Sequence, residues 1–294
     1  MASTGPERRN AIVTGAGSGL GQAISRRLGR DGWRIALADI NEDSCRETLR
    51  QVEQAGGEGR IERLDVSQSE SWQELRDRLQ RDWPQLDLLV NNAGVGGSGE
   101  MGQFSIEDWR WVLSVNLFGG IYGCHTMVDW LKAHPDRSHI INIASFAAIS
   151  SAPSMAAYNV GKAGILSLSE TLYTELRPYG VGITVVCPAF FQTNLLDGGR
   201  FQSDGQRSIA ATYMRRARFT AEDVADAAVR AIASKKLFVV LGRKARFYWL
   251  MKRWYPVTFL KTVCGGYLRK LRQLKEEEEA EMSGEPRAES DKNP

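Results

Sequence analysis

Residues 11–21 read Ala-Ile-Val-Thr-Gly-Ala-Gly-Ser-Gly-Leu-Gly, an apolar run followed by a glycine-rich turn. Ala23, Ile24 and Leu28 follow at helical spacing, so the segment predicts a short buried strand, a tight loop and a helix that begins in the loop. Glycines let a pyrophosphate approach the amides at the helix N-terminus, where the helix dipole favours an anion. The stretch therefore predicts the phosphate-binding turn of a dinucleotide site.

Six further segments are predicted as strands, and each is separated from the next by a segment long enough for a helix. This alternation predicts an α/β fold with a parallel sheet. Right-handed crossovers make it a Rossmann-type, doubly wound sheet of about seven strands with helices on both faces. Ligands bind such sheets at the carboxyl ends of the strands, so functional residues are expected there. The six segments are Arg34–Ala38, Arg60–Leu64, Leu86–Val90, His139–Ile143, Gly182–Val186 and Leu237–Leu241.

The composition indicates a globular protein, because 43% of the 294 residues are apolar and 25% are charged. The net charge of +3 predicts no nucleic-acid partner. The cysteines are far apart, and the histidines have no Cys or Glu at ligand spacing, so no metal site or disulfide framework is expected. The histidines are interpreted as surface or helix-end residues. These residues are Cys45, Cys124, Cys187 and Cys264, and His125, His134 and His139.

The N-terminal residues 1–10 are polar and lack the apolar run of a signal peptide. No stretch is long and apolar enough to span a bilayer as a helix. We therefore expect a cytoplasmic protein.

Asp39 lies at the end of the second predicted strand, where a carboxylate accepts hydrogen bonds from the adenosine ribose. It would repel a 2′-phosphate, and no Arg or Lys lies in the glycine loop or directly after Asp39 to compensate. The pattern therefore favours NAD(H) over NADP(H). An aspartate that only caps a helix or braces a loop is the alternative interpretation.

The spacing TGxxxGxG differs from GxGxxG and resembles that of the short-chain dehydrogenase/reductase family. Other motifs of this family follow in the same order over about residues 8–241. Two positions depart from the family pattern without removing a reacting group: Ala189 replaces the usual glycine, and Gly161 stands where serine is common. The motifs are Asp65-Val66, Asn91-Asn92-Ala93-Gly94, Ser114-Val115-Asn116, Ile143-Ala144-Ser145, Tyr158-Asn159-Val160-Gly161-Lys162 and Pro188-Ala189-Phe190-Phe191-Gln192-Thr193.

The resemblance implies an oxidoreductase that interconverts a secondary alcohol and a ketone, with Asn116, Ser145, Tyr158 and Lys162 as catalytic residues. Tyr158 and Lys162 are four residues apart, on one face of a helix. A nearby ammonium and a positively charged nicotinamide both favour the phenolate, so the pKa of Tyr158 is expected to fall from about 10 toward neutrality. Tyr158 would then serve as general acid–base. Each residue alone has an ordinary structural explanation; the four in order favour catalysis.

The resemblance also assigns roles to the other catalytic residues. Ser145 would hold the substrate oxygen, Lys162 would bind the nicotinamide ribose, and Asn116 would position a water that links Lys162 to solvent. No metal is expected. The expected cofactor contacts are Gly15, Ser18, Gly19, Leu20, Gly21, Asp39, Ile40, Asp65, Val66, Asn92, Ala93, Gly94, Tyr158, Lys162, Pro188 and Thr193.

The domain organisation follows from the same resemblance and from a change of composition after Leu241. Residues 8–241 are interpreted as one dinucleotide-binding catalytic domain, with residues 190–219 as a lid over the substrate. Residues 242–275 form an extension that mixes basic and aromatic residues, and residues 276–294 are expected to be a disordered acidic and polar tail.

The predicted lid is rich in apolar side chains, which favours a hydrophobic substrate such as a lipid, steroid or aryl compound. Two alternative functions stay open. A 3-oxoacyl thioester reductase of this family usually prefers NADPH, against which Asp39 argues. A non-catalytic redox sensor would not need Tyr158 and Lys162 together. The expected substrate contacts are Ser145, Phe146, Tyr158, Phe190, Phe191 and Leu195.

Three interpretations of the extension compete. It packs on its own fold or on a subunit partner, which we favour, it helps to enclose a bulky substrate, or residues 243–275 touch an anionic membrane surface as a peripheral contact. Pro256 and Gly265-Gly266 are expected to divide it into short helices. The family is usually dimeric or tetrameric, so a homodimer or homotetramer is expected.

Overall fold

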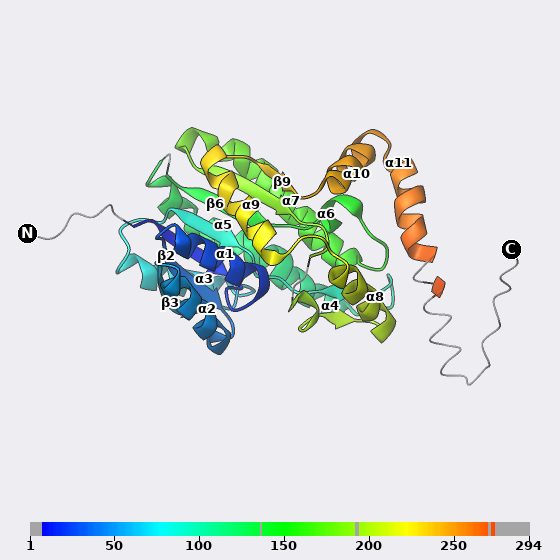
Figure 1. Cartoon of the computed structure of the whole chain (residues 1–294), viewed down its shortest axis with the longest axis horizontal. Coiled ribbons are helices and arrows are strands. Elements are labelled where there is room, and N and C mark those ends of the chain that lie inside the picture. Colours follow the sequence, from blue (N-terminus) through cyan, green and yellow to red (C-terminus); the bar gives the residue numbers. More distant parts are fainter. Residues whose placement is uncertain (1–7, 136, 192–193, 270–271, 274–294) are drawn as a thin grey trace, which may run out of the picture.

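Seven parallel strands form one sheet in the order β3-β2-β1-β4-β6-β7-β9 in this computed structural model (Figure 1). The structure describes residues 8–135, 137–191, 194–269 and 272–273. All seven predicted strands are confirmed, with their ends shifted by a few residues, and so is the doubly wound fold class. The strands are β1 (Asn10–Thr14), β2 (Arg34–Asp39), β3 (Glu58–Arg63), β4 (Leu88–Asn91), β6 (His139–Ile143), β7 (Gly182–Cys187) and β9 (Phe238–Val240).

The strand order reverses beside β1, which is the central feature of the sheet. Ala11 of β1 pairs with Ile35 of β2 on one side and with Leu88 of β4 on the other. The chain winds from β1 out to β3, returns to β4, and then winds the other way to β9. This reversal leaves a crevice at the carboxyl ends of β1 and β4, which is where ligands bind in such sheets.

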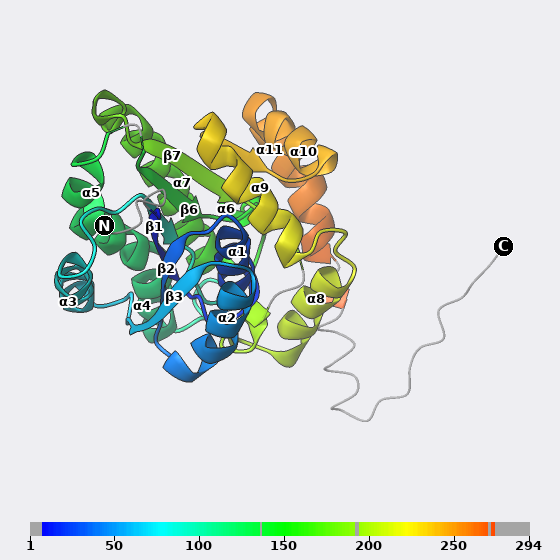
Figure 2. The same cartoon turned by 60° about the vertical axis from the view of Figure 1, so that its left-hand side comes forward.

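Helices cover both faces of the sheet (Figure 2). One face carries α1, α2 and α9, and the other carries α3, α5 and α7. The two sets are α1 (Gly19–Arg30), α2 (Glu42–Gln54) and α9 (Ala221–Ser234), and α3 (Ser69–Gln80), α5 (Gly119–Lys132) and α7 (Ala156–Glu175).

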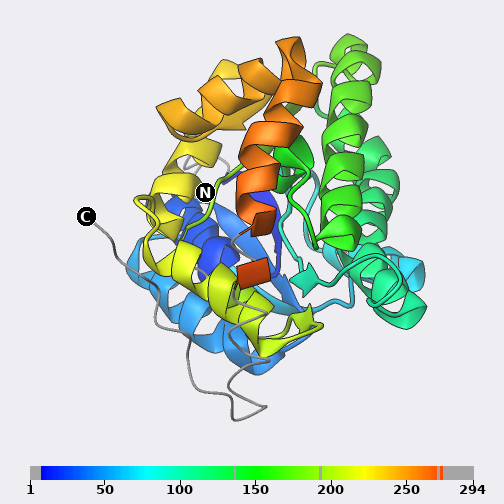
Figure 3. The ribbon, with the colours of Figure 1, turned by 90° about the vertical axis from the view of Figure 1, so that its right-hand side faces the viewer.

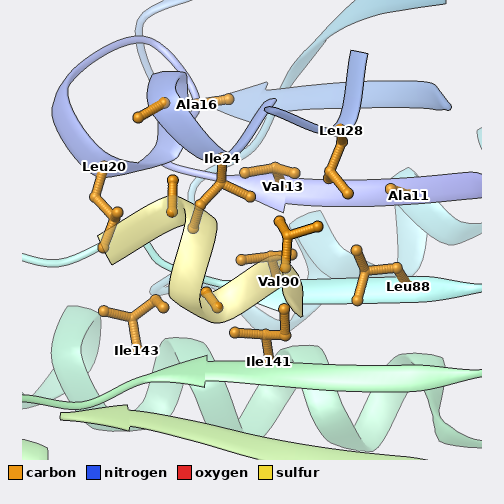
Figure 4. Packing of buried hydrophobic residues seen from close by; sticks show 14 of the residues in the cluster. Ala11, Val13, Ala16, Leu20, Ile24, Leu28, Leu88, Val90, Ile141 and Ile143 are labelled. Atoms are coloured by element: carbon orange, nitrogen blue, oxygen red, sulfur yellow. The ribbon is translucent and has the colours of Figure 1, made fainter. Parts of the chain in front are cut away.

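The core lies between the sheet and these helices, and side chains of one strand alternate between its two halves. Val13 faces α1 and α9 (Figure 4), whereas its neighbour Ile12 faces the other layer. Ile24 and Leu28 of α1 are fully buried against the strands. Full burial of such side chains contributes about 1.5–3 kcal/mol each, so this packing fixes where the glycine loop ends and α1 begins.

His139 corrects one expectation, because it is neither a surface nor a helix-end residue. It lies in β6 and is 1% exposed, and its Nε2 is 2.8 Å from Thr184 Oγ1 of β7. Gly182 makes room for the ring, since a Cβ there would lie 2.2 Å from His139 Nδ1. Burial lowers the pKa of His139 to about 4, so the ring is a neutral part of the core.

A second, two-stranded sheet joins the loop after β4 to the segment after β7. Gly97 pairs with Arg200 and Ser98 with Phe201. Sequence analysis missed these strands because two residues carry no periodicity. The remaining elements before the C-terminal extension are β5 (Gly97–Ser98), α4 (Ile106–Leu113), η1 (Ser114–Phe118), α6 (Ala147–Ser150), η2 (Arg177–Tyr179), η3 (Asn194–Leu196), β8 (Arg200–Phe201) and α8 (Asp204–Arg215).

The C-terminal extension packs on its own fold. Trp249 lies 5.0 Å from Phe238 of β9, measured between ring centroids. Lys252 Nζ donates to Ser151 Oγ at 2.8 Å, and the Cys264 thiol donates to the Ser150 carbonyl at 3.3 Å, so two side chains of the extension bond the end of α6. Within the described residues, no helix is both long and apolar enough to cross a bilayer.

The breaks in the extension are only partly those expected. The extension forms α10 (Arg243–Trp254), α11 (Pro256–Phe259) and η4 (Leu260–Cys264). Pro256 does separate α10 from α11. Gly265-Gly266 does not interrupt the helix, because helical structure continues through both glycines to residue 269. This part of the prediction is wrong. The predicted tail, residues 276–294, lies outside the described residues.

Candidate active site

One cavity of about 500 Å³ lies at the carboxyl ends of the strands and joins the glycine loop to the predicted catalytic tyrosine. Most predicted cofactor and substrate residues line it. Gly21 and Asn116 do not, and Thr193 lies outside the described residues. The predicted residues that line the cavity are Gly15, Ser18, Gly19, Leu20, Asp39, Ile40, Asp65, Val66, Asn92, Ala93, Gly94, Ser145, Phe146, Tyr158, Lys162, Pro188, Phe190, Phe191 and Leu195.

The glycine loop needs glycine at three of its positions. Gly15 and Gly19 have φ of 62° and 53°, in the left-handed region that side chains disfavour. Gly21 packs α1 against the loop, since a Cβ there would lie 2.0 Å from the Gly15 carbonyl oxygen. Ser18 precedes α1, and its side chain makes no capping hydrogen bond. The loop thus presents the start of α1 and an uncommitted hydroxyl to the cavity, as a pyrophosphate site requires.

Asp39 faces the glycine loop from the end of β2. Its Oδ2 accepts a hydrogen bond from Gly17 N at 3.0 Å, and its Oδ1 accepts one from Asn41 N at 3.0 Å. The carboxylate therefore braces the loop, and it also lines the cavity. Ile40, beside it, is 60% exposed and gives this end of the cavity an apolar edge.

Thr14 clamps the loop after β4 to the glycine loop. Its Oγ1 accepts hydrogen bonds from Asn92 N at 2.9 Å and from Ala93 N at 3.0 Å. Asn92 Nδ2 in turn donates to the Thr14 carbonyl at 2.8 Å. This role of Thr14 was not among the predictions, although a threonine at the end of a strand and directly before the glycines is a sequence signal for it. These bonds hold Ala93 and Gly94 against the cavity.

Tyr158 and Lys162 lie one turn apart on α7, and both are buried. Lys162 Nζ is 5.9 Å from the centroid of the Tyr158 ring and donates to the Ile143 carbonyl at 3.0 Å. Both side chains line the cavity beside Ser145. Three of the four predicted catalytic residues thus line the same cavity.

Burial dominates the protonation of this pair. It raises the pKa of Tyr158, and the hydrogen bond with Ser145 lowers that pKa by less. Burial also lowers the pKa of Lys162 to about 8. The protein's own groups therefore do not supply the lowered tyrosine pKa that the sequence suggested. That lowering would have to come from the positive charge of an oxidised nicotinamide.

Ser145 follows β6, where its Oγ accepts a hydrogen bond from Ala147 N at 3.1 Å. The serine thus closes the turn that leads into α6, whose N-cap residue is Phe146. Because one lone pair of the hydroxyl is held in this way, the oxygen stays fixed at the cavity wall, where the hydroxyl also bonds Tyr158.

Asn116 lies in η1, a π-helical turn, and holds the loop after β4 from the other side. Its Oδ1 accepts from Val95 N at 2.9 Å and its Nδ2 donates to the Val95 carbonyl at 2.8 Å. A small cavity of about 10 Å³, lined by both Asn116 and Lys162, lies next to the main one. That volume is room for about one water molecule between polar groups.

Gly94 and Gly161 let the loop after β4, the turn η1 and helix α7 pack closely together. A Cβ on Gly94 would lie 2.9 Å from Asn116 Oδ1 and 3.3 Å from Lys162 Nζ. A Cβ on Gly161, one of the departures from the family pattern, would lie 3.2 Å from Asn116 Cβ. The glycine at position 161 therefore lets α7 pack directly on the π-turn.

The far end of the cavity is apolar and includes a residue that sequence analysis missed. Phe190 stacks on Tyr213 of α8 with ring centroids 5.2 Å apart, and Tyr213 lies 6.0 Å from Tyr267 of the extension. Tyr267 lines the cavity. Figure 3 shows the end of the extension beside α8. No sequence signal pointed to Tyr267, because it is brought there only by the path of the extension over the fold.

Among the described residues, no group of three or more His, Cys, Asp or Glu side chains is placed to hold a metal ion. The only cation that lines the main cavity in the described part of the chain is Lys162.

Comparison with protein families gives a clear match. Residues 9–202 match the family model described as short chain dehydrogenase. A curated relative, the probable oxidoreductase EphD of Mycobacterium tuberculosis, is 33% identical over 232 residues, which is 76% of this chain but only 39% of that protein. The 3beta-hydroxysteroid dehydrogenase 1 of Eggerthella lenta is 34% identical over 63% of this chain and 71% of its own length.

Solved structures are similar as well. A short chain dehydrogenase/reductase from Burkholderia phymatum in complex with NAD is 31% identical, with a TM-score of 0.79 over 84% of this chain and 93% of its own. A metagenomic short-chain oxidoreductase in complex with NADP is 26% identical, with a TM-score of 0.65 over 79% and 95%. The likeness supports a nicotinamide dinucleotide without choosing between the two.

Proposed function

This chain belongs to the short-chain dehydrogenase/reductase family, whose members are oxidoreductases of alcohol and ketone groups, and we propose that it interconverts a hydrophobic secondary alcohol and its ketone with NAD(H). The observation that carries the proposal is the single cavity that runs from Asp39 past Tyr158, Lys162 and Ser145 to an apolar end. A dinucleotide and a substrate need such a shared space for their reacting atoms to meet.

The residues of the cavity fit the cofactor. The left-handed Gly15 and Gly19 open the start of α1 to a pyrophosphate, and Gly94 leaves the floor beside Lys162 open. When bound, the nicotinamide accepts or supplies the hydride. Lys162, the cation of the cavity, would hold the ribose next to it.

The chain's own residues would handle the proton. Ser145, whose oxygen is fixed by Ala147 N, would donate to the substrate oxygen and keep it beside the Tyr158 hydroxyl. Tyr158 would take the proton of an alcohol or give one to a ketone. Lys162 and a water in the small cavity that it shares with Asn116 would pass that proton on toward solvent.

Preference for NAD(H) rests on charge at the Asp39 end. The carboxylate would accept hydrogen bonds from the adenosine ribose and would repel a 2′-phosphate. Among the described residues that line the cavity, no Arg or Lys lies at that end to offset the repulsion.

The apolar end supports a hydrophobic substrate of the lipid, steroid or aryl class. Phe146, Phe190, Phe191 and Leu195 line it together with Tyr267. Burial of apolar surface in such a pocket favours a bulky, weakly polar ketone over a small polar one.

The test follows NADH absorbance with the full chain across ketones from short and polar to steroid-sized. We expect turnover with NADH, and a kcat/KM that rises with apolar size. Turnover limited to 3-oxoacyl thioesters would support the thioester reductase instead. Tight NADH binding without turnover of any substrate would support a redox sensor and contradict the enzyme proposal.

Assembly and location stay predictions. A homodimer or homotetramer is tested by light scattering of the full chain, and a monomer at micromolar concentration would contradict it. A cytoplasmic location with peripheral membrane contact is tested by fractionating cells that express the full chain. Appearance of the protein outside the cytoplasmic and membrane fractions would contradict that location.

A further inference from the structure

Helix α10 turns an apolar stripe toward solvent. Phe247, Leu250 and Trp254 are 60%, 56% and 75% exposed, and their spacing of three and four residues puts them on one side of the helix. The other side is the packed one, where Ala245 is buried and Trp249 contacts Phe238. An exposed stripe of large apolar side chains on an otherwise docked helix indicates an interaction surface.

The stripe continues beyond the helix. Tyr255, Val257 and Leu260 are 67%, 61% and 41% exposed, whereas Phe259 between them is fully buried. We call the exposed side chains of residues 243–261 the outer face of the extension. Its buried anchors fix it on the fold, so the exposed side chains are held in place and do not come from a loose tail.

This outer face is basic, and among the described residues its cations have no acidic partner. Residues 243–261 hold six Lys and Arg and no Asp or Glu, whereas the whole chain is only +3, so the rest of the chain is net acidic. The side-chain contacts of its cations are with neutral groups: Arg246 Nε donates to the Val240 carbonyl, and Lys244 lies over the Tyr248 ring. In the described part of the chain, none of these cations forms an ion pair with a carboxylate.

Basic residues flank the apolar stripe on both sides. On a helical projection, Arg246 and Arg253 lie to one side of Phe247, Leu250 and Trp254, and Lys244 lies to the other. Apolar side chains in the middle with cations at the edges match a lipid interface. There the apolar side chains enter the acyl region, and the cations meet the anionic headgroups. Trp and Tyr are the side chains most enriched at that boundary.

A second copy of this chain fits the outer face less well. In a two-fold dimer the same patch would face itself, so cations would oppose cations with no carboxylate to separate them. A nucleic acid would use the charges but would leave Phe247, Leu250 and Val257 without a partner.

We propose that the outer face, residues 243–261, docks this protein on an anionic lipid surface. The apolar stripe supplies insertion into either kind of membrane, and the flanking cations supply the additional attraction to anionic headgroups. The same extension carries Tyr267 into the wall of the main cavity, so one segment links the docking surface to the substrate end.

The test is flotation of the full chain with vesicles of phosphatidylcholine, alone or mixed with phosphatidylglycerol. We expect the bound fraction to rise by about 10-fold or more with phosphatidylglycerol and to fall as salt is added, because the attraction of basic segments to anionic lipid is screened. Absence of binding to phosphatidylglycerol vesicles at low salt would overturn the proposal.

Two double variants separate the two contributions. Leu250→Ser/Trp254→Ser should lose binding to both kinds of vesicle, and Lys244→Glu/Arg253→Glu should lose only the gain from phosphatidylglycerol. The matched controls are Met101→Ser, at an apolar residue that is 74% exposed elsewhere, and Arg46→Glu/Arg50→Glu on α2. Equal losses in the controls would overturn the proposal.

Unchanged NADH affinity and melting temperature show that each variant is folded, so the readout does not depend on turnover. Light scattering supplies the remaining distinction. If the wild-type protein is an oligomer that binds neither kind of vesicle, and Leu250→Ser/Trp254→Ser is a monomer, the outer face joins copies of the chain and the lipid proposal is wrong. If an RNA oligonucleotide binds wild type and this double variant equally while vesicles bind neither, the charges serve nucleic acid and the proposal is likewise wrong.

Discussion

The amide nitrogen of Gly17 lies 3.0 Å from Asp39 Oδ2, so the glycine loop and the carboxylate at the end of β2 form one hydrogen-bonded unit. Gly17 is held close on its other side too, since a Cβ there would lie 1.8 Å from Ser44 Oγ. The carboxylate that would select the cofactor is thus also a brace of the loop that would bind its pyrophosphate. Variants at Asp39 must be chosen to separate these two roles.

Asp39→Asn keeps an oxygen that accepts from Gly17 N but removes the negative charge. We expect it to relax discrimination against NADPH while the protein stays as stable as wild type. Asp39→Ala should also weaken NADH binding by roughly 10-fold to 100-fold, because hydrogen bonds to a charged group contribute about 1.5–3 kcal/mol. Titration of protein fluorescence with NADH and NADPH measures both. Asp31→Asn, at the far end of α1, is the control, and an unchanged NADH to NADPH ratio in Asp39→Asn would remove the charge argument.

Gly21→Ala tests the packing of the glycine loop on α1. The new methyl would lie 2.0 Å from the Gly15 carbonyl oxygen, so loop and helix must separate. We expect NADH affinity to fall by at least about 10-fold, since the helix N-terminus moves away from the pyrophosphate. Gly198→Ala is the matched control because a Cβ there meets no atom within 4 Å. Similar NADH affinity for the two variants would show that the loop does not depend on this contact.

Lys162 gives a pH dependence of stability. Its pKa is about 8 in the folded protein against 10.5 for the ordinary group, so between these values the unfolded chain binds more protons. Stability then rises with pH through this window as the folded protein escapes the cost of a buried ammonium. The effect, taken as wild type minus Lys162→Met, is on the order of 3 kcal/mol. Urea denaturation below pH 8 and above pH 10.5 measures it, and a difference that stays flat with pH would mean that the buried amine is well compensated.

Tyr267→Ala tests the contribution of the extension to substrate choice. Removal of the ring enlarges the apolar end of the cavity beside Tyr213. We expect kcat/KM for the bulkiest ketones to rise by about 10-fold relative to small ones, the scale on which pocket contacts discriminate. Tyr255→Ala, in the same extension but 67% exposed, should change nothing in this ratio. A parallel change in both variants would point to a loosened extension in place of a wider pocket.

Much of this site was predictable because its signals are local. The seven strands are predicted from short segments and their spacing, and Asp39 is predicted because ligands bind at the carboxyl ends of parallel strands. Ser145 and Tyr158 are predicted from family motifs that are themselves short stretches of sequence. The helical spacing of Tyr158 and Lys162 likewise needed no knowledge of distant contacts.

The features that the sequence did not predict depend on contacts between distant segments. Tyr267 reaches the cavity through the path of the extension, and His139 is buried because Gly182 and Thr184 of the next strand accommodate its ring. Gly265 continues a helix where propensity predicts a break, and the Cys264 thiol just before it is bonded to the Ser150 carbonyl at the end of α6. The pKa of Tyr158 moves upward because its burial outweighs the groups around it, which a sequence does not reveal.

Tyr158→Phe tests the central claim most directly, because it removes one oxygen from the reacting position and leaves the ring that packs in α7. We expect kcat for ketone reduction to fall by about 10²-fold to 10⁴-fold, the range that general acid–base catalysis contributes, while NADH affinity stays nearly that of wild type. Tyr173→Phe, on the same helix but 37% exposed, is the matched control and should keep full activity. The deciding measurement is the rate of NADH oxidation at saturating ketone for the three proteins. Loss of NADH oxidation in Tyr158→Phe alone, with NADH still bound, is the predicted result. A rate in Tyr158→Phe close to that of wild type would show that another group transfers the proton.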